Sequence, residues 1–492
     1  MSAKALMLQG TGSDVGKSVL TAALCRLAKR RGLSVAPFKP QNMSNNAMAC
    51  ATGGEIGRAQ ALQARAAGVE PNTDMNPVLL KPQTDRAAQV VLQGKALTTM
   101  EAMEYMAERA SLMGAVIQSF SRLCDTHDLV LVEGAGSPAE VNLRARDIAN
   151  MGFARRANVP VCMIGDIDKG GVIASLVGTQ NVLSPEDAAM IKGFIINKFR
   201  GDARLFDDGV DFIQARTDWP CFGVVPWLRA TAQLPAEDAV VLEKQTTAHS
   251  GRIKIVAPMF SRLANFDDAD PLRLEPNVDF EWIPPGHPIP LDADLVILFG
   301  TKSTIGDLAF LKAQKWHHDI IAHARSGGHV LGICGGYQML GGLIKDPNGY
   351  DGAPGIAKGL GLLDVETEMT GAKHVAQVLA ASAQTGEPIS GYEIHSGRTA
   401  GPDAARPFSH IGDRPEGATS ANGRIQGTYL HGAFSDDTFR QAWLSRLDAH
   451  MSSKLNYEAA VDIALDELAD GVESALDVDA LFALAQCPKI GS

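Results

Sequence analysis

The sequence predicts an α/β protein with two domains, and three observations lead to this. Short apolar runs end in glycine-rich or charged loops and precede segments with helical spacing of apolar residues, the pattern of parallel strands joined by helices. A polar stretch at 241–251 interrupts this pattern, and a new series of strands begins at Ile253. Glycine is abundant at 49 residues while aromatic residues make up 6%, which indicates many tight turns and packing of small side chains.

Composition and charge exclude several classes of protein. The chain has 492 residues and a formal charge of −11, which argues against a general nucleic-acid or membrane-surface protein because both of those partners are anionic. No apolar run approaches the roughly 18 residues that a membrane span requires. The seven cysteines are scattered and form no C-x-x-C pair, unlike a disulfide framework or zinc cluster. We expect a cytoplasmic enzyme with no nucleic-acid or membrane partner.

The first domain, expected at 1–240, begins with a buried strand at 5–8 and a helix that starts near Lys17 and stops at Gly32. Apolar residues in that helix recur at helical spacing, and its last turn is basic. Four further apolar runs each end in a glycine-bearing or charged loop, as parallel strands do when their carboxyl ends form the functional site. These expected strands are 128–133, 159–164, 191–196 and 222–226.

The turn after the first strand has the sequence of a phosphate-binding loop. Backbone N–H groups and the helix N-terminus would bind phosphate oxygens, Lys17 would reach the terminal phosphates and Ser18 would hold Mg²⁺. A standard loop of this kind has glycine where Thr11 stands, so a simple glycine-rich turn is the alternative. The expected nucleotide-binding residues are Gly10, Thr11, Gly12, Ser13, Asp14, Val15, Gly16, Lys17 and Ser18.

This loop, with its extra residue, resembles the dethiobiotin-synthetase group of nucleotide-binding domains, which activate a carboxylate with ATP. The resemblance implies that Glu133, at a strand end, contacts Mg²⁺ directly or through water. Asp166 ends another strand and would add a metal-binding carboxylate, and Lys169 would stabilise negative charge and is expected to bind substrate. The alternatives are a turn-capping acid at Glu133 and a solvated acidic loop at 166–171.

The stretch 197–200 resembles the base-reading turn of GTPases, but Arg200 stands where guanine-specific proteins carry aspartate. The guanine contact is therefore missing, and ATP is the expected nucleotide. Asn197 is expected near the adenine base, with a simple strand-end turn as the alternative.

A cysteine in the second half lies in a nucleophile-elbow sequence. Cys334 has glycines on both sides, follows an apolar strand and precedes a helix, an arrangement that exposes a reactive side chain on a sharp turn and favours its thiolate. His431, at the end of another short strand, is the best candidate for the base among twelve histidines. Taken alone, a histidine at a strand end is more often structural.

Residues 252–447 resemble the class I glutamine amidotransferases, which release ammonia from glutamine through a cysteinyl thioester. The resemblance implies that Gly300 and Thr301 belong to an upstream loop that forms the oxyanion hole with the N–H of Gly335. The glutamate that usually follows the histidine by two residues is absent after His431, so the sequence predicts a catalytic Cys–His dyad. Glu393 is an acidic candidate nearby, and a structural or substrate-loop role is equally open to it. Residues 448–492 are expected to form an acidic helical tail.

The two halves together have a natural combined chemistry. ATP would convert a carboxylate into an acyl phosphate, and ammonia from the second domain would displace phosphate to give an amide. The loop after the second strand could bind a molecule edged with carboxylates and amides, although turns and caps would use the same residue types. The expected substrate-binding residues there are Lys39, Gln41, Asn42, Asn45 and Asn46.

Four strings, 9–18, 38–46, 165–171 and 391–395, closely resemble the cobyric acid synthase family, across nearly the whole chain. The resemblance implies ATP-, Mg²⁺- and glutamine-dependent amidation of the b, d, e and g carboxylates of a corrinoid, adenosylcobyrinic acid a,c-diamide. Cobyrinic acid a,c-diamide synthase and CTP synthase share the domain plan and are the nearest alternatives. A switch ATPase of the partitioning type is an alternative from a different class. Its second domain would only bind a partner, and such a domain has no need of a cysteine in a nucleophile elbow.

Overall fold

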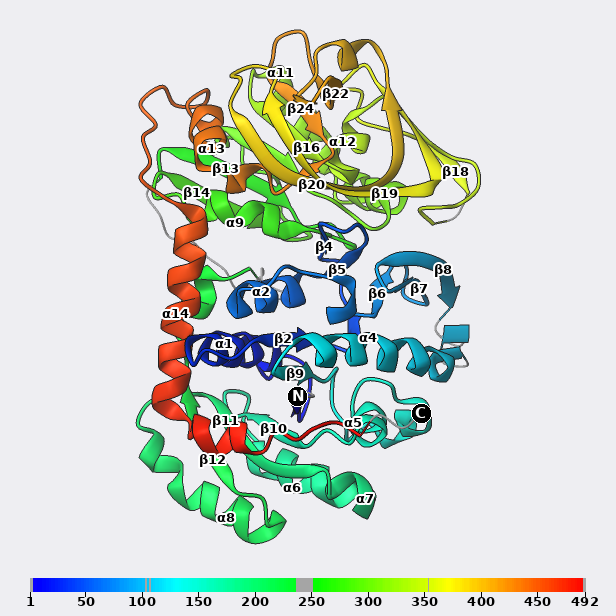
Figure 1. The fold of residues 1–492 in the computed structure, drawn as a ribbon. Helices are drawn as coiled ribbons and strands as arrows, with labels where there is room; N and C mark the ends of the chain where they lie inside the picture. The colour runs from blue at the N-terminus through cyan, green and yellow to red at the C-terminus, as the bar shows by residue number, and fades with distance from the viewer. Residues whose placement is uncertain (1–2, 102–103, 106–107, 236–250, 353, 490–492) are drawn as a thin grey trace.

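The computed structural model describes residues 3–101, 104–105, 108–235, 251–352 and 354–489. Figure 1 shows two α/β domains stacked on each other, with one long helix running along the side of the first domain. The linker predicted at 241–251 lies outside the described residues apart from Gly251. The predicted class, a parallel-sheet domain followed by a second α/β domain, is confirmed.

The first domain is built on a six-stranded parallel sheet with the order β12-β11-β10-β1-β9-β2. Its central strands are buried apolar runs because helices cover both faces. β1 lies between β9 and β10, so their carboxyl ends meet at one edge, where ligands bind in sheets of this type. The strands are β1 (Lys4–Gly10), β2 (Val35–Phe38), β9 (Leu129–Glu133), β10 (Val161–Asp166), β11 (Ile191–Phe199) and β12 (Cys221–Pro226). The helices are α1 (Lys17–Arg30), α2 (Arg58–Ala67), α4 (Met113–Thr126), α5 (Met151–Ala157), α6 (Val172–Val182), α7 (Pro185–Ala188) and α8 (Asp207–Thr217).

An insertion between β2 and β9 forms two small sheets that lie between the domains (Figure 1). The segment after β2, expected to be a loop, instead starts with β3, whose backbone pairs with β6 in parallel. Its backbone groups are thereby hydrogen-bonded in a buried position, where an irregular loop would leave them unpaired. The strands are β3 (Gln41–Met43), β4 (Ala47–Ala49), β5 (Glu55–Gly57), β6 (Val78–Pro82), β7 (Ala87–Leu92) and β8 (Lys95–Glu101).

The second domain has a six-stranded sheet with the order β14-β13-β15-β16-β24-β23, and the strand expected to begin at Ile253 is its β13. A second sheet contains a long antiparallel hairpin, β19 and β20, that the sequence did not predict. The main-sheet strands are β13 (Ile253–Pro258), β14 (Val278–Ile283), β15 (Leu295–Leu298), β16 (His329–Ile333), β23 (Ala418–Thr419) and β24 (Ile425–Thr428). The others are β17 (Leu343–Asp346), β18 (Gly355–Lys358), β19 (Glu366–Ser382), β20 (Pro388–Ala400), β21 (Ser409–Ile411), β22 (Arg414–Glu416) and β25 (Leu430–His431). The helices are α9 (Asp270–Arg273), α10 (Thr304–Ala313), α11 (Trp316–Arg325), α12 (Gly335–Leu340) and α13 (Asp437–Leu444).

The C-terminal segment returns to the first domain rather than extending as a separate tail. Its helices α14 (Tyr457–Ala475) and α15 (Val478–Ala483) bury apolar side chains in the same cluster as those of α1. Acidic residues on α14 pair with arginines on α1: Asp466 lies 2.7 Å from Arg26 and 2.8 Å from Arg30. The acidic face of this segment therefore has a basic partner within the chain. Within the described ranges, no helix has the length and apolar character needed to cross a bilayer.

Candidate active site

The loop between β1 and α1 is shaped by close contacts at two glycines. A Cβ atom on Gly10 would lie 2.4 Å from the Val15 side chain, and one on Gly16 would lie 2.2 Å from Asn197 Nδ2. Gly16 also has a φ of 97°, a region that favours glycine. Asn197 Nδ2 donates a hydrogen bond to the Val15 carbonyl at 2.8 Å. Asn197 therefore supports the loop, whereas the sequence predicted a place near the base.

Two functional groups of the loop lie where a nucleotide phosphate would bind. Lys17 Nζ donates to the Gly12 carbonyl at 2.7 Å and to the Gly136 carbonyl at 3.0 Å, so the amine spans the loop. Ser18 Oγ donates to Glu133 Oε1 at 2.7 Å, and Glu133 is fully buried. The register of β1 with β9, which pairs Leu8 with Glu133, brings this carboxylate to the loop.

The predicted metal-binding residues fit a magnesium site only in part. Ser18 and Glu133 offer a hydroxyl and a carboxylate side by side, the hard oxygen ligands that Mg²⁺ prefers. Both carboxylates already have a cationic partner, since Glu133 lies 2.8 Å from Lys39 Nζ and Asp166 accepts a hydrogen bond from Lys198 Nζ at 2.9 Å. The described part of the chain holds no group of three or more His, Cys, Asp or Glu side chains suited to a metal. An ion held by Ser18 and Glu133 would take its other ligands from phosphate oxygens and water.

Most of the side chains predicted to bind substrate are buried and hydrogen-bonded within the protein. Gln41 Oε1 accepts from a tyrosine hydroxyl at 2.7 Å, Asn42 Nδ2 donates to a glutamine at 3.0 Å, and Asn46 Oδ1 accepts from a backbone N–H at 2.7 Å. Lys39 lies 2.8 Å from the carboxylate of Glu133. These four residues are therefore held within the protein, two of them on β3.

Two predicted substrate residues, Lys169 and Asn45, are less buried than the others. Lys169 is exposed beyond the carboxyl end of β10. Asn45 is half-buried, and among the described residues its Oδ1 has no hydrogen-bond partner. Both stay predictions as substrate contacts.

Cys334 occupies the sharp turn between β16 and α12. Its φ of 53° and ψ of −110° are unusual for a residue with a side chain, and such strain occurs typically at functional sites. The glycines beside Cys334 leave no room for a side chain: a Cβ atom on Gly336 would lie 1.8 Å from the Leu298 carbonyl oxygen. The predicted nucleophile elbow is therefore present.

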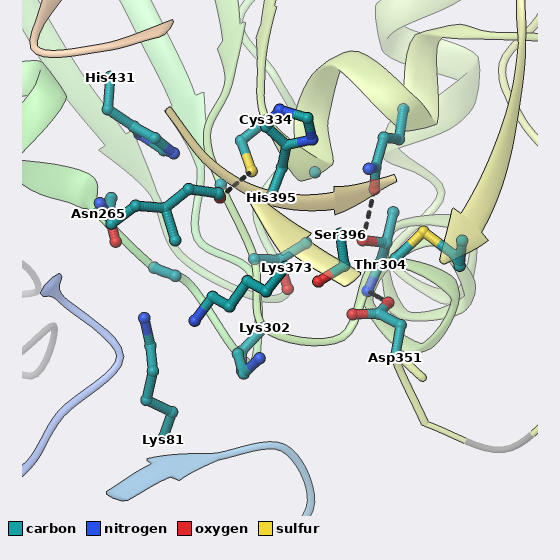
Figure 2. A pocket seen from close by; sticks show the side chains of 17 residues that line it. Lys81, Asn265, Lys302, Thr304, Cys334, Asp351, Lys373, His395, Ser396 and His431 are labelled. Atoms are coloured by element: carbon teal, nitrogen blue, oxygen red, sulfur yellow. Dashed lines mark hydrogen bonds between the residues drawn. The ribbon is translucent and has the colours of Figure 1, made fainter. Parts of the chain in front are cut away.

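The predicted oxyanion residues meet beside Cys334. A Cβ atom on Gly335 would lie 3.1 Å from the backbone nitrogen of Thr301, and one on Gly300 would lie 3.4 Å from His431 Cε1. All four residues line one pocket with Cys334. Figure 2 shows Cys334 and His431 at one end of this pocket. The Gly300–Thr301 loop and Gly335 thus lie in one pocket with Cys334, and their role as an oxyanion hole stays a prediction.

His431 has an acidic partner that the sequence did not reveal, Asp268. His431 Nδ1 lies 2.7 Å from Asp268 Oδ2, and the backbone N–H of Gly432 donates to Asp268 Oδ1 at 2.6 Å. Tyr392 stacks on the imidazole with ring centroids 5.3 Å apart. Burial lowers the pKa of His431, but the Asp268 carboxylate and the Cys334 thiol outweigh this and raise the pKa to about 10. Asp268 is therefore the acidic partner of His431 that the sequence lacked, and catalysis by Cys334 and His431 stays a prediction.

Glu393, the acidic candidate from the sequence, has a different set of partners. It accepts hydrogen bonds from Arg414 at 2.6 Å and from His374 at 3.1 Å. Burial raises the pKa of this carboxyl, but the neighbouring His395 and Arg414 outweigh burial and lower it to about 2. Glu393 therefore does not orient His431. The signal for Asp268 was the acidic run at 267–270, which no spacing rule links to His431.

The loop that holds Asp268 is anchored to the first domain. Asp267 forms an ion pair with Arg58 of α2 at 2.9 Å, and Asn265 Nδ2 donates to the Ala47 carbonyl at 2.8 Å. The backbone N–H of Asn265 also donates to Asn46 Oδ1, in the predicted substrate loop. The Cys334 site therefore depends on contacts from both domains.

Comparison with known proteins matches both halves and the whole chain. The model of the CobB/CobQ-like glutamine amidotransferase domain matches residues 254–439, and that of the CobQ/CobB/MinD/ParA nucleotide binding domain matches residues 6–241. Cobyric acid synthase of Hyphomonas neptunium is 64% identical over 488 residues, which cover 99% of each chain. Cobyric acid synthase of Paracoccus denitrificans is 63% identical over 482 residues, which cover 98% of this chain and all of the relative.

The chain belongs to the cobyric acid synthase family. This confirms the resemblance found in the sequence, and it makes the chain an ATP-dependent amide ligase with a glutamine amidotransferase domain. The family assignment covers the chain almost end to end, including the C-terminal segment that packs on α1.

In this member of the cobyric acid synthase family, Asp268→Asn is expected to lower kcat for glutamine hydrolysis by about 10²–10⁴-fold. The amide keeps the shape of the carboxylate, but it neither stabilises the imidazolium of His431 nor holds the same tautomer. Glutamate release measures the effect. Asp292→Asn, which changes an exposed carboxylate of the same domain, is the matched control. A kcat within threefold of the wild-type value would show that Asp268 is dispensable.

Proposed function

We propose that this chain amidates the b, d, e and g carboxylates of adenosylcobyrinic acid a,c-diamide in the cytoplasm, giving adenosylcobyric acid. The observation that carries the proposal is that one chain combines a Cys334–His431–Asp268 site with a phosphate loop holding Lys17 and Ser18. The names of the relatives, cobyric acid synthase, support the choice of product.

The Cys334 site would release ammonia from glutamine in two steps. The thiolate attacks the side-chain amide carbon, and backbone N–H groups beside Gly300 and Gly335 stabilise the oxyanion. The imidazolium of His431, held by Asp268, gives its proton to the departing ammonia and leaves a thioester. His431 then takes a proton from water, which attacks the thioester and releases glutamate.

The phosphate loop would activate the carboxylate. A corrinoid carboxylate attacks the γ-phosphorus of ATP, ADP leaves, and an acyl phosphate forms. Lys17 and the N-terminus of α1 stabilise the charge on the phosphates. Ser18 and Glu133 would hold Mg²⁺, which neutralises phosphate charge when bound, and Asp166 would join them only by releasing Lys198. Ammonia then attacks the acyl carbon and displaces phosphate to give the amide.

The proposed substrate contacts lie at the carboxyl edge of the first sheet. Lys169 is exposed there, and Lys39 lies next to Glu133 at the phosphate loop. Both amines would attract a polycarboxylate against an acidic protein exterior. Asn197 would contribute to nucleotide binding indirectly, by holding the phosphate loop in place.

The test is incubation of the purified protein with adenosylcobyrinic acid a,c-diamide, ATP, Mg²⁺ and glutamine, followed by mass spectrometry. Four sequential conversions of acid to amide are expected. The matched arm supplies cobyrinic acid without the two amides. Conversion of that acid at only two positions, with no reaction of the diamide, would identify the alternative, cobyrinic acid a,c-diamide synthase.

A further inference from the structure

Three lysine side chains point into the pocket at the end away from His431 (Figure 2). Lys302 follows β15, Lys373 lies on β19, and Lys81 comes from β6 of the first domain. Lys81 is buried, and the other two are half-buried. The glutaminase mechanism described above uses none of them.

The pocket has fewer carboxylates than ammonium groups. Glu55, also from the first domain, is buried and accepts a hydrogen bond from Lys81 at 2.8 Å and another from Lys373. Lys302 Nζ donates to the neutral amide of Gln89 at 3.0 Å. Asp351 lines the same pocket, but burial raises the pKa of its carboxyl to about 7. Glu55 therefore pairs with two of the three lysines, and Lys302 has an amide rather than a carboxylate as its hydrogen-bond partner.

The lysines themselves show the effect of this imbalance. Burial lowers the pKa of Lys373 to about 7, although Glu55 opposes the change, and repulsion from Lys81 and Lys302 adds to it. Burial also lowers the pKa of Lys302, again with repulsion from Lys81. Buried charge without a counter-charge is costly, so the pocket is suited to an anionic group.

The carboxylate of the glutamine substrate has the right chemistry and position. When the side-chain amide of glutamine lies against Cys334, its α-carboxylate lies at the other end of a short extended molecule. We propose that Lys302, Lys373 and Lys81 bind the α-carboxylate of glutamine, so that the first domain completes the glutamine site. This inference rests on the glutaminase part of the proposed function.

The placement of Lys81 gives this inference a consequence for the whole molecule. Lys81 and Glu55 come from the inserted sheets of the first domain, whereas Lys373 and Lys302 belong to the second. Glutamine would therefore bind well only when the two domains are docked. The lysines would recognise a carboxylate, and the corrinoid substrate carries carboxylates just as glutamine does. The experiment must therefore distinguish binding of glutamine from binding of the corrinoid.

The experiment compares glutamine with glutamine α-amide, in which a neutral carboxamide replaces the α-carboxylate, by measuring side-chain amide hydrolysis. Wild-type protein is expected to prefer glutamine strongly in kcat/KM. In Lys81→Met and Lys302→Met, the KM for glutamine is expected to rise at least about 30-fold, whereas the value for the α-amide changes little. The preference for glutamine therefore falls, which a merely structural role of either lysine would not produce.

Lys345→Met, which removes a partly exposed lysine of the second domain, is the matched control and should keep the full preference. Lys302→Met tests the inference separately if Lys81→Met does not fold. An unchanged preference in folded variants overturns the inference, and so does a rise in the KM for the corrinoid in place of that for glutamine. Failure of the wild-type protein to amidate a corrinoid would refute the proposed substrate, while these hydrolysis measurements still test the lysines.

Discussion

Cys334→Ala is expected to abolish glutamine-supported amidation, by at least about 10⁴-fold, and to leave ammonia-supported amidation intact. Alanine cannot form the thioester, so no ammonia is released from glutamine. The phosphate loop lies in the other domain and still forms the acyl phosphate, which free ammonia attacks. The measurement is amide formation with glutamine and with ammonium salt at a pH that supplies neutral ammonia.

The control for this variant is Cys221→Ala. Cys221 is half-buried in β12 and lies outside the pocket that Cys334 lines, and burial raises the pKa of its thiol. Normal activity with both nitrogen sources is expected. If folded Cys334→Ala lost ammonia-supported amidation as well, the division of labour between the domains would be wrong.

Lys17→Ala is expected to remove amidation from either nitrogen source, by at least about 10³-fold. The amine lies at the phosphate loop, bonded to the Gly12 and Gly136 carbonyls. Its loss removes the charge that stabilises the transferring phosphoryl group. ADP formation in the presence of corrinoid measures the effect.

Lys4→Ala, at an exposed position on β1, is the matched control for Lys17→Ala and should retain full turnover. Basal glutamine hydrolysis distinguishes a local effect from unfolding, since the Cys334 site lies in the other domain. Wild-type ATP turnover in Lys17→Ala would refute the assignment of the phosphate loop.

The sequence predicted features whose signal is local. The phosphate loop and the cysteine elbow can each be recognised from about ten consecutive residues. Both need glycine at fixed positions, because backbone and side chains approach closely there. The buried parallel strands were visible as apolar runs between turns. The hairpin of β19 and β20 was missed because much of its surface is exposed, so its residues do not form a continuous apolar run.

The features that the sequence did not predict arise from contacts between distant segments. Asp268 and His431 are 163 residues apart, and their pairing follows from the packing of the turn at 266–269 against the end of β25. The amides of the substrate loop looked available for a ligand, yet β3 pairs with β6 and turns most of them inward. The acidic C-terminal segment looked like a solvated tail because its partners, Arg26 and Arg30, lie on α1 near the other end of the chain.

The most direct test of the central claim uses glutamine labelled with ¹⁵N in the side-chain amide, together with unlabelled ammonium in the medium. If Cys334 releases ammonia for an acyl phosphate formed at the Lys17 loop, each new amide of the corrinoid carries ¹⁵N, and one ADP forms per amide. Amides made without ¹⁵N, or made without ADP formation, would contradict the coupling of the two sites.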